Sequence, residues 1–171
     1  LGIRYLTLYA FSKENWTRPH EEVNFLMGLL SAYLDKKVAE LKKNNIVFNV
    51  IGRVQDLTDA VQTRIHKAKE KTKTSTGMTL NLALSYSSRI EITEACRKIA
   101  ESVKKGALEP SKIDEKLISE HLYTREIPDP DLLIRTSGEM RISNFLLWQI
   151  SYAELYVTPH YWPEFSGDEF E

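Results

Sequence analysis

Short apolar runs alternate along this chain with longer segments in which apolar residues recur every three or four positions. The runs indicate buried strands, and the periodic segments indicate amphipathic helices. Strands separated by helices pair in parallel, with right-handed crossovers. The sequence therefore predicts an α/β protein: a single domain with a central, mostly parallel β-sheet flanked by helices. The predicted strands are residues 3–11, 46–51, 78–86, 132–134 and a last one near 155–156.

The longest periodic segment follows Pro19, which fixes the first turn of a helix that ends near residues 42–44. Glu21 and Glu22 fall in its first turn, where carboxylates complement the positive end of the helix dipole. Phe25 and Met27 either fill the core or line an apolar tunnel. Further helices are predicted over residues 57–73, 88–105 and 112–122.

Several local features of these helices can be predicted as well. Ser87 or Ser88 is expected to cap the helix 88–105, and Ser111 the helix 112–122. Glu91 and Glu94 lie three residues apart without a histidine partner. They are therefore predicted to be surface charges rather than metal ligands.

Composition narrows the class of protein. The chain has 171 residues, 42% of them hydrophobic, which suffices for one domain with a real core. Its 23 basic and 24 acidic residues balance, so no overall field favours nucleic acid or an anionic membrane. The one cysteine, Cys96, excludes an intrachain disulfide and fits a reducing cytosol. No run is long enough to span a bilayer, and no signal peptide is visible.

A polar loop after the strand 132–134 concentrates groups that bind phosphate. In an open parallel sheet, ligands bind at the carboxyl ends of strands. Arg135 and Arg141 each present a planar fork of donors that matches phosphate oxygens. Gly138 allows a backbone turn that brings both arginines and Ser143 toward one anion. From spacing alone, the arginines either bind such an anion or pair with nearby carboxylates.

Residues 12–18 form a second polar loop, again directly after a predicted strand. Asn15 and Arg18, three residues apart before the helix, suit a hydrogen-bond donor and a phosphate clamp. For Trp16, packing is expected to be the larger part of its role.

These two loops carry a resemblance to a known family. The sequences RTSGE (135–139), RISNFLLWQ (141–149) and YAELY (152–156) closely resemble the C-terminal signature of cis-prenyltransferases. The bacterial undecaprenyl diphosphate synthases are the nearest match. A second family block is similar to YAFSKENWTRP at residues 9–19. The resemblance covers essentially the whole chain.

The resemblance implies an enzyme that condenses isopentenyl diphosphate onto an allylic diphosphate, commonly farnesyl diphosphate, with a cis double bond at each step. The product would be a long-chain polyprenyl diphosphate, such as the undecaprenyl diphosphate that serves as carrier lipid for peptidoglycan precursors. Also implied are one domain over residues 1–171 with a deep apolar tunnel, a Mg²⁺ cofactor, a homodimer and a cytoplasmic location. Membrane contact would be peripheral at most, and nucleic acid is not an expected partner.

The resemblance assigns the two diphosphates to different loops. The positions expected to grip isopentenyl diphosphate are Arg135, Arg141 and Ser143, with Glu22 as a supporting carboxylate. The dipole role of Glu22 remains the alternative. The residues that match the loop beside the allylic diphosphate are Ser12, Asn15, Trp16 and Arg18, of which Asn15 and Arg18 are expected to be catalytic.

Two more residues receive roles in the same way. Met78 stands where relatives place a large apolar residue at the closed end of the tunnel, so it is expected to limit product length; packing in the core is the alternative. Glu154 corresponds to a carboxylate near the magnesium ion, with pairing to an arginine of the signature loop as its alternative.

The sequence also departs from the family pattern. Ser87, Ser88 and Ile90 stand where many bacterial relatives have two glycines and a tryptophan, and Met140 stands where some have histidine. Family members also carry, ahead of the position of Leu1, a block MDGNGRW and a histidine, whose Asp holds magnesium and whose amides cradle the allylic diphosphate. Because this sequence contains none of that block, we expect the 171-residue piece alone to be inactive or nearly so.

Other functions remain open at this point. One is a non-catalytic subunit of a heteromeric cis-prenyltransferase, although such subunits lose the phosphate-gripping residues that this chain keeps. Another is a synthase of short or medium cis-prenyl chains. A generic nucleotide binder is disfavoured, since neither a dinucleotide-binding nor a P-loop glycine motif occurs.

Overall fold

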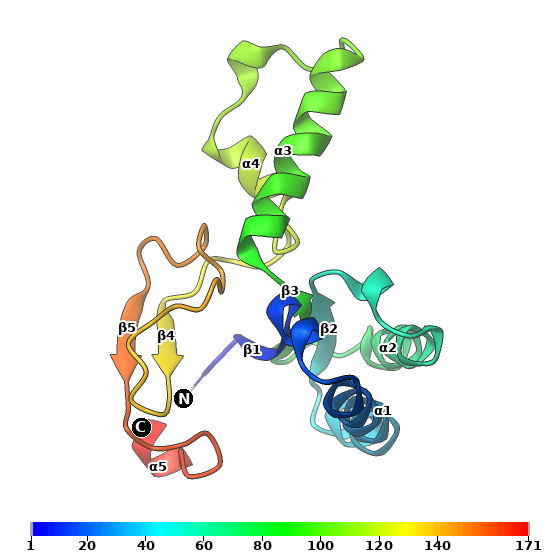
Figure 1. Cartoon of the computed structure of the whole chain (residues 1–171), viewed down its shortest axis with the longest axis vertical. Helices are drawn as coiled ribbons and strands as arrows, with labels where there is room; N and C mark the ends of the chain where they lie inside the picture. Colours follow the sequence, from blue (N-terminus) through cyan, green and yellow to red (C-terminus); the bar gives the residue numbers. More distant parts are fainter. Residues whose placement is uncertain (1, 171) are drawn as a thin grey trace. The chain divides into compact units, whose positions relative to one another are not determined.

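The structure, a computed structural model, describes residues 2–170. It confirms the α/β class with parallel strands. Two compact units form along the chain, residues 2–87 and residues 88–170. Each unit has its own parallel sheet, of three strands and of two strands respectively (Figure 1). The assignment of residues 1–171 to a single domain stays a prediction, as does the apolar tunnel.

In residues 2–87, the three strands follow the order β1 (Tyr5–Ser12), β3 (Thr79–Tyr86) and β2 (Val47–Ile51). Both neighbours pair with β3 in parallel, and Tyr5 and Val47 stand opposite Thr79 on either side of it. The three strands therefore end at the same edge of the sheet. The strands predicted over residues 3–11, 46–51 and 78–86 are confirmed to within two residues at each end.

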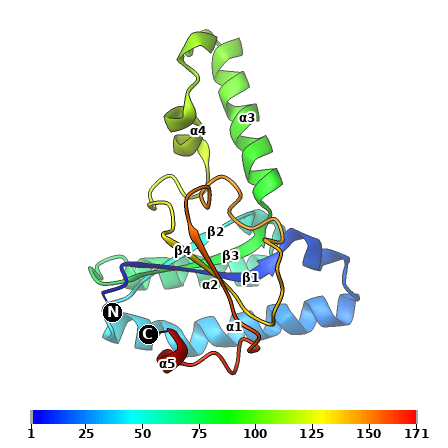
Figure 2. The same ribbon diagram turned by 90° about the vertical axis from the view of Figure 1, so that its left-hand side faces the viewer.

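Two helices, α1 (His20–Lys43) and α2 (Asp59–Thr72), cover one face of this sheet (Figures 1 and 2). Leu80, Leu82 and Leu84 of β3 project onto that face at every second position and pack in one core with the helices. The helical residues in this core are Val23, Met27, Leu34, Val38, Leu41, Val61, Ile65 and Ala68. Met27 is thus a core residue, whereas the side chain of Phe25 is 66% exposed.

The ends of these helices differ slightly from the predicted ones. Pro19 is the N-cap of α1 rather than part of its first turn, and Glu21 and Glu22 occupy that turn as expected. The helix predicted from residue 57 begins at Asp59, because the side chain of Thr58 accepts the Val61 N–H (3.4 Å) as its cap. A short 3-10 turn, η2 (Val54–Asp56), precedes it.

A row of polar side chains crosses the three-stranded sheet. Thr7, Asn81 and Asn49 share one register position on β1, β3 and β2. The amide of Asn49 donates to Asn81 (2.9 Å), and the amide of Asn81 donates to the hydroxyl of Thr7 (3.3 Å). Asn81 is fully buried, so these bonds satisfy polar groups that would otherwise be costly to desolvate.

Residues 88–170 contain a two-stranded parallel ladder of β4 (Leu132–Arg135) and β5 (Glu154–Val157). The predicted strand at 132–134 is confirmed but is not fully buried, since Leu132 is 44% exposed. The unit also contains α3 (Ser88–Lys104), η3 (Pro110–Lys112), α4 (Glu115–His121) and α5 (Gly167–Phe170). Helices α3 and α4 lie side by side (Figures 1 and 2).

The predicted Ser111 cap is wrong. Ser111 lies in η3, and α4 is capped by Asp114, whose carboxylate accepts the Leu117 N–H at 2.8 Å. Asp and Ser are about equally good N-caps. The 3-10 turn at Pro110 shifts the start of the α-helix past the serine to the aspartate.

The prediction that Glu91 is a surface charge is also wrong. Its side chain is 1% exposed and accepts hydrogen bonds from the backbone N–H of Tyr123 (2.7 Å) and the side-chain amide of Gln149 (3.2 Å). Glu94 is half-buried and accepts from the hydroxyl of Tyr123 at 2.6 Å. The donors lie far along the chain from α3, so spacing within the helix gave no sign of them.

None of the helices in residues 2–170 combines the length and the apolar composition that crossing a membrane requires.

Gly52 gives a test of this fold. Its φ is +109°, and an added Cβ would lie 2.2 Å from the carbonyl oxygen of Leu84. Gly52→Ala should therefore lower the free energy of unfolding by at least about 2 kcal/mol, measured by urea denaturation. Gly28 is the matched control, since an added Cβ on this α1 residue meets nothing within 4 Å.

Gly28→Ala should raise the free energy of unfolding by roughly 0.5–1 kcal/mol, because alanine is the better helix former. Equal effects of the two substitutions would contradict the close contact between residue 52 and the end of β3.

Candidate functional site

The predicted site residues divide between the two units. Ser12, Asn15, Trp16, Arg18 and Glu22 form one continuous segment that leaves the carboxyl end of β1. In residues 88–170, β4 ends at Arg135, and the loop after it carries Arg141 and Ser143. Each group thus follows the end of a parallel strand, where sequence analysis placed it.

The segment predicted as a polar loop at residues 12–18 is instead a 3-10 helix, η1 (Lys13–Thr17), with a capping box. The hydroxyl of Ser12 accepts the backbone N–H of Asn15 (3.2 Å), and Oδ1 of Asn15 accepts the backbone N–H of Ser12 (2.8 Å). This reciprocal pair satisfies donors that a helix start leaves open. Both residues therefore have a structural role, which uses only the oxygen of the Asn15 amide.

Trp16 anchors η1 to the sheet. Its indole Nε1 donates to the hydroxyl of Ser85 near the end of β3 (2.8 Å), and its ring meets Phe11 edge to face at 5.3 Å. The ammonium of Lys13 lies 5.8 Å from the centroid of the same ring. Packing and one hydrogen bond thus account for the position of Trp16, in line with the expectation for this residue.

Sequence analysis missed Asp56, which lies in η2 after the end of β2. Its carboxylate accepts from Lys13 (2.8 Å), Ser85 (3.0 Å) and Arg53 (3.1 Å). Partial burial acts to raise the pKa of Asp56, but the hydrogen bonds from Lys13, Ser85 and Arg53 outweigh it, so the pKa lies below its ordinary value. The i, i+3 spacing of Arg53 and Asp56 was the only local signal for this cluster.

Arg18 and Glu22 form an ion pair of 2.7 Å across the start of α1. Both side chains are almost half exposed, so the pair contributes on the order of 0.3–0.5 kcal/mol. An anion can therefore displace Glu22 from Arg18 at little cost. The role of Glu22 beside isopentenyl diphosphate stays a prediction.

Arg135 ends β4, opposite Val157 of β5. Its Nε is buried and has no hydrogen-bond partner within the part of the chain that the structure describes. A buried donor without a partner is costly, and an arginine donor is satisfied well by an anionic oxygen. Arg141 is 67% exposed and pairs with Glu139.

The loop after β4 has a special backbone. Ser137, Gly138, Ser143, Asn144 and Leu146 all have positive φ, between 49° and 68°. The turn predicted at Gly138 is therefore confirmed. The backbone N–H groups of Ser137 and Gly138 donate to the carbonyls of His160 (2.7 Å) and Thr158 (2.8 Å), which tie the loop to the segment after β5. Convergence of Arg135, Arg141 and Ser143 on one anion stays a prediction.

The same loop holds the start of α3. The carbonyl and the side-chain oxygen of Asn144 accept the backbone N–H groups of Ser88 and Arg89, each at 3.0 Å. The hydroxyl of Ser88 accepts the Leu147 N–H at 2.9 Å. The Ser88 hydroxyl thus binds a residue 59 positions away, which no local pattern predicts, and the cap of α3 by Ser87 or Ser88 stays a prediction.

Glu154 begins β5 and stands opposite Leu132, whereas Arg135 stands at the other end of the ladder. Three steps along a strand separate the two by about 10 Å. Residues 2–170 contain no group of three His, Cys, Asp or Glu that could hold a metal ion. Mg²⁺ commonly binds one or two carboxylates together with water and substrate phosphates, a role that a lone Glu154 fits.

Met78 lies just before β3 and is half-buried, and its carbonyl accepts the Val47 N–H at 2.9 Å. It therefore sits at the edge where the strands begin, about 25 Å along the eight residues of β3 from the edge that carries η1. Its role in product length stays a prediction.

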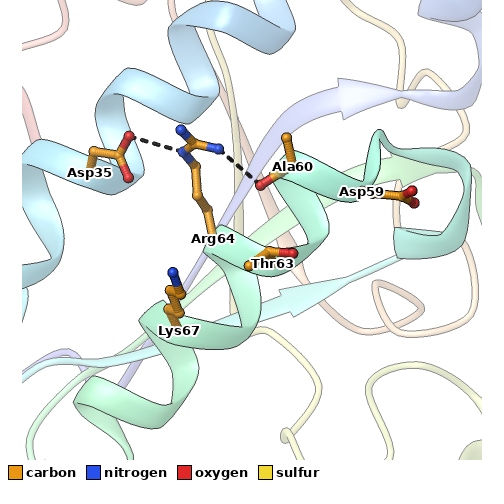
Figure 3. A pocket seen from close by; sticks show the side chains of 6 residues that line it. All are labelled: Asp35, Asp59, Ala60, Thr63, Arg64 and Lys67. Carbon is orange, nitrogen blue, oxygen red and sulfur yellow. Dashed lines mark hydrogen bonds and ion pairs between the residues drawn. The ribbon is translucent and has the colours of Figure 1, made fainter.

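A pocket of about 330 Å³ opens on the outer surface of α1 and α2 (Figure 3). Arg64 crosses it and donates to Asp35 (2.9 Å) and to the carbonyl of Ala60 (3.1 Å). Five of its six lining residues are polar or charged and none of the six is a predicted site residue, so it does not correspond to the predicted apolar tunnel.

Comparison with known proteins gives a consistent result. A sequence model of the family described as putative undecaprenyl diphosphate synthase matches residues 1–171. An isoprenyl transferase of Clostridium tetani is 52% identical over 165 residues, which are 96% of this chain and 65% of the relative. A ditrans,polycis-undecaprenyl-diphosphate synthase ((2E,6E)-farnesyl-diphosphate specific) of Vibrio cholerae is 49% identical over 165 residues, 96% of this chain and 66% of the relative.

Solved structures agree. The chain is similar to lavandulyl diphosphate synthase from Lavandula x intermedia, solved in complex with dimethylallyl diphosphate, with a TM-score of 0.95 and 40% identity over 99% of this chain and 73% of that one. A probable undecaprenyl diphosphate synthase from Campylobacter jejuni gives a TM-score of 0.85 and 38% identity over 98% of this chain and 76% of that one. This chain spans about 65% of the length of the first curated relatives it matches.

One cluster of ionisable side chains lies in the segment after β5, where Thr158 and His160 bind the loop that follows β4. The carboxylate of Glu169 binds the hydroxyl of Thr158 and Nδ1 of His160 (2.8 Å). The hydrogen bond that the His160 ring donates to Glu169 raises the pKa of His160 above 6.5. The bonds from Thr158 and His160 lower the pKa of Glu169 below 4.5.

The two shifts predict a pH window. The contribution of His160 is fully present below 6.5 and is lost as the pH rises through its raised value. The contribution of Glu169 is present above 4.5 and is lost as the pH falls through its lowered value. The pair should therefore stabilise the fold most between these two values. The test is to measure the free energy of unfolding of the wild type and of His160→Gln by urea denaturation at several pH values.

The difference in unfolding free energy between the wild type and His160→Gln should shrink from about pH 6 to about pH 8. A difference that stays constant or grows over this range would contradict the pair.

Proposed function

Because this chain belongs to the undecaprenyl diphosphate synthase family, we propose that the protein catalyses cis-prenyl chain elongation. It would condense isopentenyl diphosphate onto an allylic diphosphate, with farnesyl diphosphate as the primer and undecaprenyl diphosphate, the carrier lipid for peptidoglycan precursors, as the product. The names of two curated relatives about 50% identical support prenyl transfer, and the name of the Vibrio cholerae relative supports the primer and the product.

The observation that carries the proposal is the buried Nε of Arg135, which lacks a partner within residues 2–170. It lies at the carboxyl end of β4, where a parallel sheet presents its ligands. A diphosphate oxygen would satisfy this donor, and the guanidinium would hold the charge of the bound isopentenyl diphosphate. The side chain of Arg141 is 67% exposed, so solvent weakens its pair with Glu139, and Arg141 can contribute to the same anion.

The second substrate is assigned to the segment after β1. In each step a carbon–oxygen bond of the allylic diphosphate breaks, a carbon–carbon bond forms, and the condensing unit loses a proton. The departing diphosphate needs donors and cations that stabilise its charge. Arg18 would supply a guanidinium and Asn15 the N–H groups of an amide whose oxygen the capping box already uses.

Three further features belong to the proposal. Glu154 would be a protein ligand of Mg²⁺, which prefers carboxylate and phosphate oxygens and would neutralise diphosphate charge. A homodimer would cover the side chains of β5, among which Leu155 is 62% exposed. The protein would act in the cytoplasm, with peripheral membrane contact at most, and nucleic acid would not be a partner.

A shorter product is the second candidate. It is favoured by the TM-score of 0.95 to lavandulyl diphosphate synthase, whose solved complex contains dimethylallyl diphosphate. Product length and primer preference separate the two candidates directly. A non-catalytic subunit is disfavoured by the presence of Arg18, Arg135 and Arg141.

The two roles of Asn15 can be separated by substitution. Asn15→Ala removes the hydrogen bond that the Asn15 side chain accepts from the Ser12 N–H and should lower the free energy of unfolding by about 1 kcal/mol, measured by urea denaturation. Asn15→Asp keeps an oxygen for the Ser12 N–H and should retain stability, yet it lacks the N–H donors and adds negative charge beside a diphosphate. Its turnover should fall at least as far as that of Asn15→Ala. Full turnover of a stable Asn15→Asp protein would rule out the donor role.

The experiment that tests the proposed function is an assay of the purified full-length protein with farnesyl diphosphate, labelled isopentenyl diphosphate and magnesium, with products separated by chain length. Long cis-polyprenyl products are expected. Arg135→Ala should raise KM for isopentenyl diphosphate at least about thirty-fold, corresponding to about 2 kcal/mol of lost binding.

Arg125→Ala is the matched control. Arg125 is exposed, and its ion pair with Glu126 is long, at 3.8 Å, and therefore weak. It should leave KM unchanged. Absence of any product longer than the primer would refute the proposed function.

A further inference from the structure

We infer that Asp56 is a positioning residue for the allylic substrate: through Ser85 and Lys13 it fixes Trp16, and with it the turn η1 that carries Asn15 and Arg18. The inference rests on the proposed function for the identity of the substrate. The geometry that supports it lies entirely within residues 2–87.

Asp56 stands where the ends of the three parallel strands meet. Lys13 follows β1 and Arg53 follows β2. Ser85 is the second-last residue of β3. All three donate to this one carboxylate, which is 16% exposed. Two cations and a hydroxyl at hydrogen-bond distance hold a carboxylate more firmly than a single surface ion pair does.

The backbone at Ser85 is shaped for this contact. Ser85 has a φ of +47°, which is uncommon for a residue with a side chain. The pairing of β1 with β3 shifts register at the same place, between Tyr9 and Phe11 and again between Phe11 and Ser12. Bulges of this kind re-aim side chains, and here the Ser85 hydroxyl links Asp56 to the indole of Trp16.

The contacts of Lys13 and Trp16 attach the turn η1 to its neighbours. It is five residues long and none of them is buried. Besides its cap and the packing of Trp16 against the main core, three contacts attach it: the Trp16–Ser85 bond, the Trp16–Phe11 contact and the Lys13–Asp56 pair. Two of these three depend on Asp56, so the carboxylate controls where Asn15 and Arg18 are presented.

Asp56 is not itself a ligand for the substrate. A carboxylate repels a diphosphate, and its oxygens are already occupied by three donors. Its effect must therefore pass through Trp16 and Lys13. If Asp56 had a purely structural role, its loss would reduce stability without changing the ratio of the KM values for the two substrates.

The test uses the full-length protein labelled with ¹⁵N-tryptophan. The chain contains three tryptophans, and Trp16→Phe identifies which indole N–H signal belongs to Trp16. Asp56→Asn and Asp56→Ala should shift that signal and leave the signals of Trp148 and Trp162 in place. In the same variants, KM for farnesyl diphosphate should rise about ten-fold, with KM for isopentenyl diphosphate changed less than about two-fold.

Asp35→Asn is the matched control, since Asp35 also pairs with an arginine but lies on the outer surface of α1. It should change neither the Trp16 signal nor either KM. Ser85→Ala serves where an Asp56 variant does not fold, because it removes the link to the indole and leaves the pairs of Asp56 with Lys13 and Arg53. It should shift the Trp16 signal and raise KM for farnesyl diphosphate in the same direction.

An unchanged Trp16 signal in a folded Asp56→Ala protein, or an equal rise of KM for both substrates, would overturn the inference. Failure of the wild type to transfer prenyl groups would instead refute the proposed function. In that case the Trp16 signal still reports whether Asp56 holds the turn, so the two failures are distinguishable.

Discussion

The pairing of β1 and β2 on either side of β3 is the constraint on which residues 2–87 depend. Both strand pairs are parallel and begin opposite the same residue of β3. The segments that follow the three strands therefore leave the sheet at one edge. Segments that are far apart in sequence, those containing Lys13, Asp56 and Ser85, therefore reach one another. If β1 or β2 ran antiparallel to β3, the segment after it would leave the sheet at the opposite edge, away from these groups.

Much of the fold could be predicted because its signals are local. The 3.6-residue period of α1 and the apolar runs of β2 and β3 placed these elements within two residues of their observed ends. Errors arose where a choice depended on neighbours in space. The buried Glu91 had the same local spacing as a surface charge, and Ser111 was as good a cap as Asp114 until the turn at Pro110 excluded it.

For the site, the resemblance identified candidate residues, but it did not predict the hydrogen bonds that these residues make within the protein. Ser12 and Asn15 were expected beside a diphosphate, and the structure shows that they also hold one another in a capping box. The groups that support them, Asp56 and Ser85, carry no motif of their own. Asn144 likewise holds the start of α3 from a distance of 55 positions, which only the folded chain brings together.

The polar row of Thr7, Asn81 and Asn49 has a consequence for how freely this sheet can vary. Leucine, valine and isoleucine are nearly interchangeable on a strand, so an all-apolar β3 would fit its neighbours almost as well after a slip of two residues. Such a slip would move Asn81 away from both Asn49 and Thr7 and break the two hydrogen bonds of the row. This polar row thus marks the correct alignment, and the apolar positions around it are left open to substitution.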